Sequence, residues 1–411
     1  MKQSLRKGLT LIVIGPGGVG KTTVAAALGL AAASQGLGTG VITVDPARRL
    51  RDALGLPRLG AKPSAIDPRR LRGAGFDPAI RISAMVLDVQ RSWDSLVERF
   101  VASAAARQRI LVNSFYRGLS GQFAGADAYA ALEQFYQLRT SGSFDTIVVD
   151  TPPAAHTFEF IEAPANLQRL LDSRTARWLA GRQDGRNPLA LAGFAMRFVA
   201  TQLERFAGVK TLAAAGEFFA ATLEAAGDLS DRFRTIARIM HSRDVEFILV
   251  TTAEPSRLAE ARQAIARMQA DGLRLRAIVL NRLADERSIT SLGGAARLRA
   301  IASLRESVAA DPSSNRPARA LADFLTQHEA IARARFQAAA AFAREVPRRT
   351  EIILAPEFAE GLRDLGGLKQ IAELLASGSG RMSLSAIAQS VKSQSHRDKI
   401  IVANAINGDT L

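Results

Sequence analysis

One glycine-rich octapeptide near the start of the chain constrains its fold more than any other feature. Residues 15–22 read GPGGVGKT and fit the phosphate-loop pattern G-x-x-x-x-G-K-[ST] at every fixed position. The apolar run 9–14 before it suits one buried parallel strand, and residues 23–28 begin a helix of strong helix formers. Backbone N–H groups and the helix dipole then point at one place, which favours an anion. This context argues against a chance glycine-rich turn, so the sequence predicts a site for a nucleoside triphosphate.

The residues of this loop have separate expected roles. Lys21 should reach the terminal phosphates, and the Thr22 hydroxyl should bind Mg²⁺. Backbone N–H groups of the loop should point inward at the phosphates. The full predicted set of nucleotide contacts along this stretch is Gly17, Gly18, Val19, Gly20, Lys21, Thr22 and Thr23.

Further short apolar runs predict the fold class. Most of them are followed by helical patterns, which is typical of a doubly wound α/β fold with a mostly parallel sheet. In such a fold the ligand lies at the carboxyl ends of the strands. Besides residues 9–14, the predicted strands are Gly40–Val44, Thr146–Asp150, Glu246–Thr251, Arg276–Asn281 and Thr350–Leu354.

Two long inserts interrupt this pattern. Residues 83–141 are predicted to form several helices, because apolar side chains such as Trp93, Leu96 and Phe135 recur at helical spacing. The second insert, about residues 164–242, has a broad apolar face with few charges. We expect both inserts to form one helical subdomain within an ATPase domain that spans residues 1–376. Residues 377–411 then read as a flexible linker and a polar tail.

Composition narrows the possible chemistry and location. The chain has 411 residues and no cysteine, so thiolate metal sites, iron–sulfur clusters and thiol nucleophiles are excluded. No apolar run is long enough to span a membrane, and we expect a cytoplasmic protein. The net charge of +15 could serve an anionic membrane surface or nucleic acid. No dense basic block or aromatic-interleaved basic stripe exists, so we favour an arginine-rich surface without such a role.

Two carboxylates end predicted strands and are the candidate catalytic partners of Lys21. Asp45 follows the second strand, where it could bind Mg²⁺ or orient the attacking water, and it could equally cap a helix that begins at Pro46. Asp150 ends the third strand and is the expected second carboxylate on the metal side. The metal set is therefore Thr22, Asp45 and Asp150. The following segment 152–156 should form a loop that senses the γ-phosphate.

At these motifs the chain resembles the ArsA-type ATPases, which include the arsenite-pump subunit and the tail-anchored-protein targeting factor. The resemblance implies dimers that bind ATP and Mg²⁺. It also implies that Glu254 contacts nucleotide across the dimer, that Asn281 recognises adenine and that Pro356 lines the base. Residues 85–88 and 113–117 resemble the bacterial branch. The similar segments, spread over about residues 8–376, are 15–22, 43–48, 150–157, 252–255, 278–282 and 354–357.

Three features qualify what the resemblance implies. The family's second loop lysine, which reaches the partner's phosphates across the dimer, is Pro16 in this chain. The arsenite-binding thiolates and the zinc-binding cysteine pair are absent, so neither arsenite nor zinc is an expected ligand. After Asn281 no aspartate stands where guanine-reading segments carry one, which favours adenine.

Three functions remain open from the sequence. The leading one is an ATPase in which ATP closes a dimer and reshapes a helical subdomain that binds a client protein or apolar segment. The second is a non-hydrolysing regulatory subunit, paired with a paralogous ATPase that supplies the missing lysine. The third is a partition or positioning ATPase that binds DNA or membrane through its charge, with nucleic acid the less expected partner.

Overall fold

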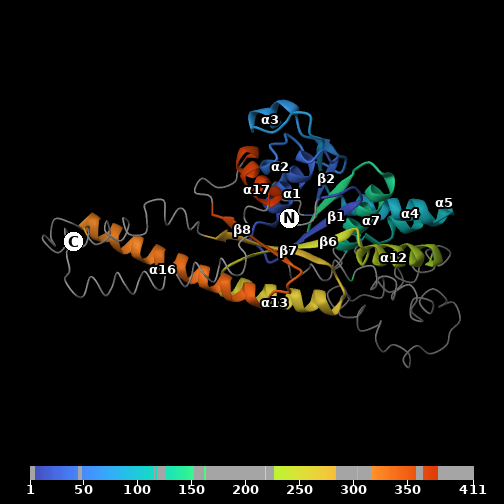
Figure 1. The fold of residues 1–411 in the computed structure, drawn as a ribbon. Helices are drawn as coiled ribbons and strands as arrows, with labels where there is room; N and C mark the ends of the chain where they lie inside the picture. Colours follow the sequence, from blue (N-terminus) through green and yellow to red (C-terminus); the bar gives the residue numbers. More distant parts are fainter. Residues whose placement is uncertain are drawn as a thin grey trace, which may run out of the picture.

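The chain folds around one eight-stranded sheet with the order β3-β4-β2-β5-β1-β6-β7-β8 (Figure 1). The computed structural model describes residues 5–44, 49–114, 116–117, 126–151, 162, 218, 226–283, 303, 316–357 and 364–377. The strands are β1 Leu9–Ile14, β2 Thr39–Thr43, β3 Ser64–Ala65, β4 Ile82–Val86, β5 Thr146–Asp150, β6 Val245–Thr252, β7 Leu275–Leu283 and β8 Glu351–Pro356. All neighbouring pairs are parallel except β3 and β4.

Helices cover both faces of this sheet. They are α1 Lys21–Ser34, α2 Arg49–Ala53, α3 Pro68–Gly73, α4 Val89–Phe100, α5 Ala104–Val112, α7 Ala126–Ser141, α12 Ala226–Met240, α13 Pro255–Ala270, α16 Arg316–Glu345 and α17 Leu365–Ser377. In Figure 1, α1, α2, α3 and α17 lie above the sheet, and α13 and α16 lie below it.

The central strand β1 shows why both faces are covered. Its six residues are all buried, so its sequence is apolar throughout rather than alternating. Leu11 and Val13 pack into one apolar core with α1 and α17, whereas Ile12 and Ile14 pack into another with α4, α7, α12 and α13. This two-sided burial confirms the predicted α/β class with a mostly parallel sheet.

The predicted strands are confirmed with small changes at their ends. Strands β1 and β5 have the predicted bounds, and the other four differ by one or two residues at an end. The prediction for the first insert was partly wrong, because residues 82–86 form β4, which pairs in parallel with β2. A short apolar run such as this one cannot be assigned to strand or helix from periodicity alone, and the exposed edge of β2 decides it. The helices of the insert begin only after Asp88, whose side chain accepts a hydrogen bond from the Arg91 N–H.

Several predictions fall outside the described residues. Asp45, the segment 152–156 and the tail after Ser377 belong to this group, as does most of the second insert. Of that insert, the structure describes Phe218 and, from residue 226 onward, α12. Among the helices that are described, none combines the length and the apolar character needed to cross a membrane.

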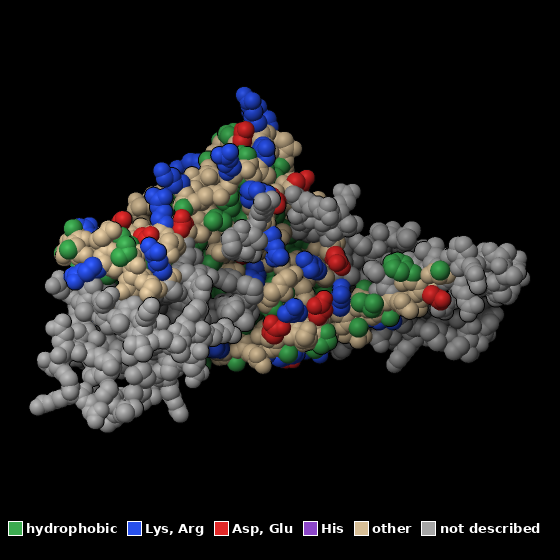
Figure 2. All heavy atoms as spheres, turned by 180° about the vertical axis from the view of Figure 1, so that it is seen from behind, with side chains coloured by type: hydrophobic (Ala, Val, Ile, Leu, Met, Phe, Trp, Pro, Cys, Tyr) green, Lys and Arg blue, Asp and Glu red, His purple; other side chains and the backbone are tan. Residues whose placement is uncertain are grey.

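The net positive charge is distributed over the surface together with acidic groups. Figure 2 shows Lys and Arg side chains across the described part of the rear face, with Asp and Glu between them. The basic side chains are most frequent toward the end of the molecule that carries α3.

Candidate functional site

The glycine-rich loop lies at the carboxyl end of β1, between β5 and β6 at the middle of the sheet. Two glycines are required by its shape. Gly15 has φ 148° and approaches β6 so closely that a Cβ would collide with the Val250 carbonyl oxygen. Gly20 has φ 96° and is the N-cap of α1. The first N–H groups of a helix have no partner within the helix, so the start of α1 offers hydrogen-bond donors next to the loop, as an anion site requires.

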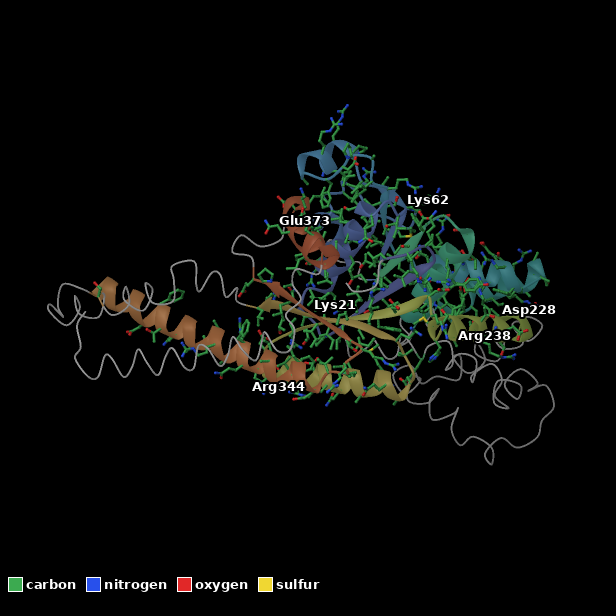
Figure 3. All side chains as sticks on the ribbon, in the orientation of Figure 1. Lys21, Lys62, Asp228, Arg238, Arg344 and Glu373 are labelled. Carbon is green, nitrogen blue, oxygen red and sulfur yellow. The ribbon has the colours of Figure 1, made fainter. Side chains whose placement is uncertain are left out.

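Lys21 is the first residue of α1 and is buried inside the molecule. Its Nζ donates a hydrogen bond to the Pro16 carbonyl oxygen at 2.9 Å, so the side chain folds back along the loop. The following Thr22 and Thr23 are half-buried. Figure 3 shows Lys21 well inside the molecule, whereas the labelled Lys62 and Glu373 lie at its periphery.

Asp150 lies beside this loop. It ends β5, is 1% exposed, and pairs in register with Val13 of β1. The Thr43 hydroxyl donates to its Oδ2 at 2.9 Å, and the Val44 N–H donates to its carbonyl oxygen at 3.1 Å. The ends of β1, β2 and β5 are thus held together, and residue 45, which is not described, follows directly from Val44.

Asn281 contacts the loop from the other side. It lies near the carboxyl end of β7, is 4% exposed, and donates from Nδ2 to the Val19 carbonyl oxygen at 2.7 Å. This hydrogen bond joins Asn281 to the loop, and the recognition of adenine by Asn281 stays a prediction. Pro356 ends β8 beside β7, where it pairs in register with Leu283.

Glu254 is the N-cap residue of α13, although its side chain makes no capping hydrogen bond. One of its oxygens lies 3.6 Å from the Arg335 guanidinium, which also lies 3.9 Å from Glu357. Arg335 comes from α16 and was not among the predicted site residues. Nothing in the local sequence marks it, because it is one of several arginines on a long helix and meets the two glutamates only in the folded chain.

The chemistry of this arrangement can be read from its donors and acceptors. A helix N-terminus and a buried lysine favour the phosphates of an anion. A carboxylate and a threonine hydroxyl supply the oxygen ligands that Mg²⁺ prefers. The structure places Lys21, Thr22, Asp150 and Asn281 at the carboxyl end of the sheet.

Comparison with known proteins identifies the family. The family model of the anion-transporting ATPases, ArsA_ATPase, matches residues 9–303. The chain belongs to the ArsA family of ATPases. The match includes the loop, Asp150, Glu254 and Asn281, whereas Arg335 and Pro356 lie beyond it.

Individual relatives are similar over shorter stretches of this ArsA-family chain. A putative arsenical pump-driving ATPase of Halobacterium salinarum is 30% identical over 166 residues, which are 39% of this chain and 24% of that protein. ATPase get3 of Aspergillus terreus is 30% identical over 166 residues, 39% of this chain and 44% of its own. An uncharacterized protein of Streptomyces coelicolor is 33% identical over 162 residues, 39% and 38% respectively. The chain therefore spans less than half the length of these relatives.

Proposed function

We propose that this chain binds MgATP at the loop 15–22 and hydrolyses it. The observation that carries the proposal is that two adjacent parallel strands end in a buried carboxylate and in a loop that leads to a buried lysine: Asp150 ends β5, and the loop after β1 leads to Lys21. Lys21 would leave the Pro16 carbonyl oxygen and bind the terminal phosphates. The loop N–H groups from Gly17 to Gly20 would hold the other phosphate oxygens.

The residues present fit Mg²⁺, because Asp150 offers carboxylate oxygens beside the loop and Thr22 offers a hydroxyl at the helix start. Asp45 is the third proposed ligand. When bound, the ion would neutralise charge on the phosphate oxygens. Asp45 is also the proposed group that orients the attacking water, and the Thr43 hydroxyl keeps Asp150 in place by donating to Oδ2.

Adenine is the proposed base. Asn281 and Pro356 come from the neighbouring strands β7 and β8, and Glu254 would contact the nucleotide of a partner subunit. Thermal unfolding with MgATP and with MgGTP at equal concentration tests this choice, since the tighter ligand raises the midpoint more. A larger shift with MgGTP would contradict it.

The client-binding part of the proposal concerns the helical inserts. Two contacts support one subdomain built from both. The Arg232 guanidinium of α12 makes a bidentate ion pair with Glu133 of α7, at 2.6 and 2.9 Å. Phe218 stacks on Tyr116 with ring centroids 6.0 Å apart. Closure of an ATP-bound dimer would then be transmitted through α7 and α12 to a surface that binds a client protein or apolar segment.

Slow ATP hydrolysis by the isolated chain is also part of the proposal, because position 16 is a proline. The family's lysine at this position acts on the partner's phosphates, and the loss of such a cation typically costs about 10³–10⁵ in rate. Its absence is also the observation that favours the second candidate, a regulatory subunit that works with a lysine-bearing paralogue.

Steady-state ATPase assays of wild type, Pro16→Lys and Pro16→Gln test this idea. We expect Pro16→Lys to raise the rate of hydrolysis and Pro16→Gln not to raise it. Both variants remove the proline, but only Pro16→Lys adds a positive charge. Fast wild-type hydrolysis that neither change alters would mean that another group already fills the role. Binding of the pure protein to DNA or anionic vesicles that weakens with salt would instead favour a partition or positioning ATPase.

A further inference from the structure

The strands on one side of β1 hold the phosphate-binding loop in shape. Gly15 packs against the backbone of β6 at Val250. Asn281 of β7 donates to the Val19 carbonyl oxygen at 2.7 Å, a contact between residues 262 positions apart. The loop is therefore supported at its start by β6 and near its end by β7.

The contact made by Asn281 is buried and closely fitted. The side chain is 4% exposed, and its Nδ2 occupies the space that a Cβ on Gly20 would need. A buried amide donor and a buried carbonyl acceptor satisfy each other's hydrogen-bonding capacity. Removing the donor leaves a buried acceptor unsatisfied, which costs free energy. One N–H of the amide is engaged with Val19, while the second N–H and Oδ1 remain for other contacts.

The backbone next to Asn281 is also unusual. Arg282 has φ 53° and is, among the described residues, the one non-glycine residue with positive φ. The pairing of β7 with β8 shifts register between Leu280 and Leu283, around this position. Such a conformation persists only where the surrounding structure enforces it, and it often occurs at functional sites. The end of β7 leaves regular strand geometry where Asn281 meets the loop.

We infer that Asn281 is a positioning residue that holds the loop 15–22 in its phosphate-binding shape. This inference rests on the proposed function, because it concerns the same nucleotide site. A residue that acts on the loop changes the affinity for the polyphosphate group itself, whichever base is attached. A residue that only reads adenine changes the affinity for ATP and leaves a base-free polyphosphate unaffected.

The experiment compares wild type with Asn281→Asp, which keeps the side-chain shape and replaces the donor facing Val19 by an acceptor. Calorimetric titration with ATP, GTP and inorganic tripolyphosphate, each with Mg²⁺, measures the affinities. We expect all three to bind about tenfold more weakly to the variant, which is the size of effect that one lost hydrogen bond can have. Hydrogen–deuterium exchange of the ligand-free protein should become faster in residues 15–22.

Two further variants make the result specific. Asn281→Ala removes the same donor without adding charge, and it replaces Asn281→Asp if that variant does not fold. Asn113→Ala is the matched control, since Asn113 is also buried and makes a hydrogen bond, to the Tyr116 N–H, away from the loop. It should change neither the three affinities nor the exchange of the loop.

The possible results distinguish the positioning role of Asn281 from the proposed function of the whole site. Weaker binding of all three ligands, tripolyphosphate included, with faster loop exchange, supports the positioning role. Loss for ATP alone, or no loss for any ligand, overturns it and leaves the proposed function standing. Failure of the wild type to bind any of the three overturns the proposed function and this inference with it.

Discussion

At the scale of single residues, the loop depends on glycines for two different reasons. Gly15 lacks space for a Cβ because the Val250 carbonyl lies against it, whereas Gly18 has positive φ and open space around it. We expect Gly18→Ala to lower the free energy of unfolding by about 1 kcal/mol, from backbone strain alone. Gly15→Ala should cost roughly 1–3 kcal/mol more, because the backbone of β6 must move. Urea unfolding of both variants measures the difference, and equal losses would contradict the packing argument.

Replacing Lys21 should weaken ligand binding while leaving the fold intact. Lys21→Ala should weaken MgATP binding by about 1.5–3 kcal/mol, the usual size of a charge-assisted contact. The fold should persist without ligand, because the hydrogen bond from Lys21 Nζ goes to the neighbouring loop, at the Pro16 carbonyl oxygen. Calorimetry measures binding and circular dichroism measures folding. Lys369→Ala is the control, since that lysine also donates to a backbone carbonyl, at Gly75, and should leave affinity unchanged. An unfolded ligand-free Lys21→Ala would show a structural role instead.

At the scale of helices, a buried ion pair joins α7 to α12. Glu133 is fully buried, and Arg232 pairs with it while stacking 3.6 Å from the centre of the Tyr136 ring. Arg232→Met should lower the free energy of unfolding by about 3 kcal/mol, because it leaves a buried carboxylate with weaker support. Arg234→Met is the control on the same helix: its ion pair with Asp231 is exposed and worth at most about 1 kcal/mol.

The double variant Glu133→Leu with Arg232→Met completes this test. Removing both charges removes the uncompensated carboxylate, so the double variant should be more stable than Arg232→Met alone. Chemical unfolding of wild type, Glu133→Leu, Arg232→Met and the double variant gives the coupling between the two side chains. Additive losses would mean that the pair does not act as a unit.

At the amino ends of β5 and β6, two carboxylates make the stability of the fold depend on pH. The pKa of Asp145 is lowered, first by the Gly38 N–H that donates to it, and the pKa of Asp244 is lowered, first by its hydrogen bond with Arg6. A lowered folded-state pKa stabilises the protein above the unfolded value of about 3.9 and loses this effect as the pH falls through the folded value. Asp244→Asn should therefore lower the thermal midpoint at pH 7 and leave it almost unchanged at about pH 2. A constant difference at both pH values would contradict the assignment.

At the scale of the whole molecule, the proposed dimer should respond to nucleotide. If Glu254 contacts nucleotide across the interface, MgATP should increase the sedimentation coefficient and Lys21→Ala should abolish the increase, since closure depends on the ligand. Sedimentation velocity with MgATP, with MgADP and without nucleotide measures this response. Identical sedimentation under all three conditions would argue against dimer closure driven by ATP.

The parts of the fold that carry a local signal could be predicted from the amino-acid sequence. The phosphate loop and the strands β1 and β5 were predicted with their bounds, because a fixed glycine pattern and a continuous apolar run need no distant partner to be recognised. Trp93, Leu96 and Phe135 were predicted as apolar faces of helices, and they are buried in α4 and α7. Local pattern was therefore sufficient for the fold class and for the position of Lys21.

Which distant groups come into contact could be learned only from the folded chain. β4 is a strand because the edge of β2 offers it hydrogen-bonding partners, which its own five residues do not reveal. Arg335 lies between Glu254 and Glu357, and Asn281 supports Val19, through chain crossings that no local spacing records. The sequence of a segment shows what that segment can form alone, whereas contacts between segments depend on the order of strands in the sheet. In that order β6 lies between β1 and β7, so the end of β7 comes close to the loop that follows β1.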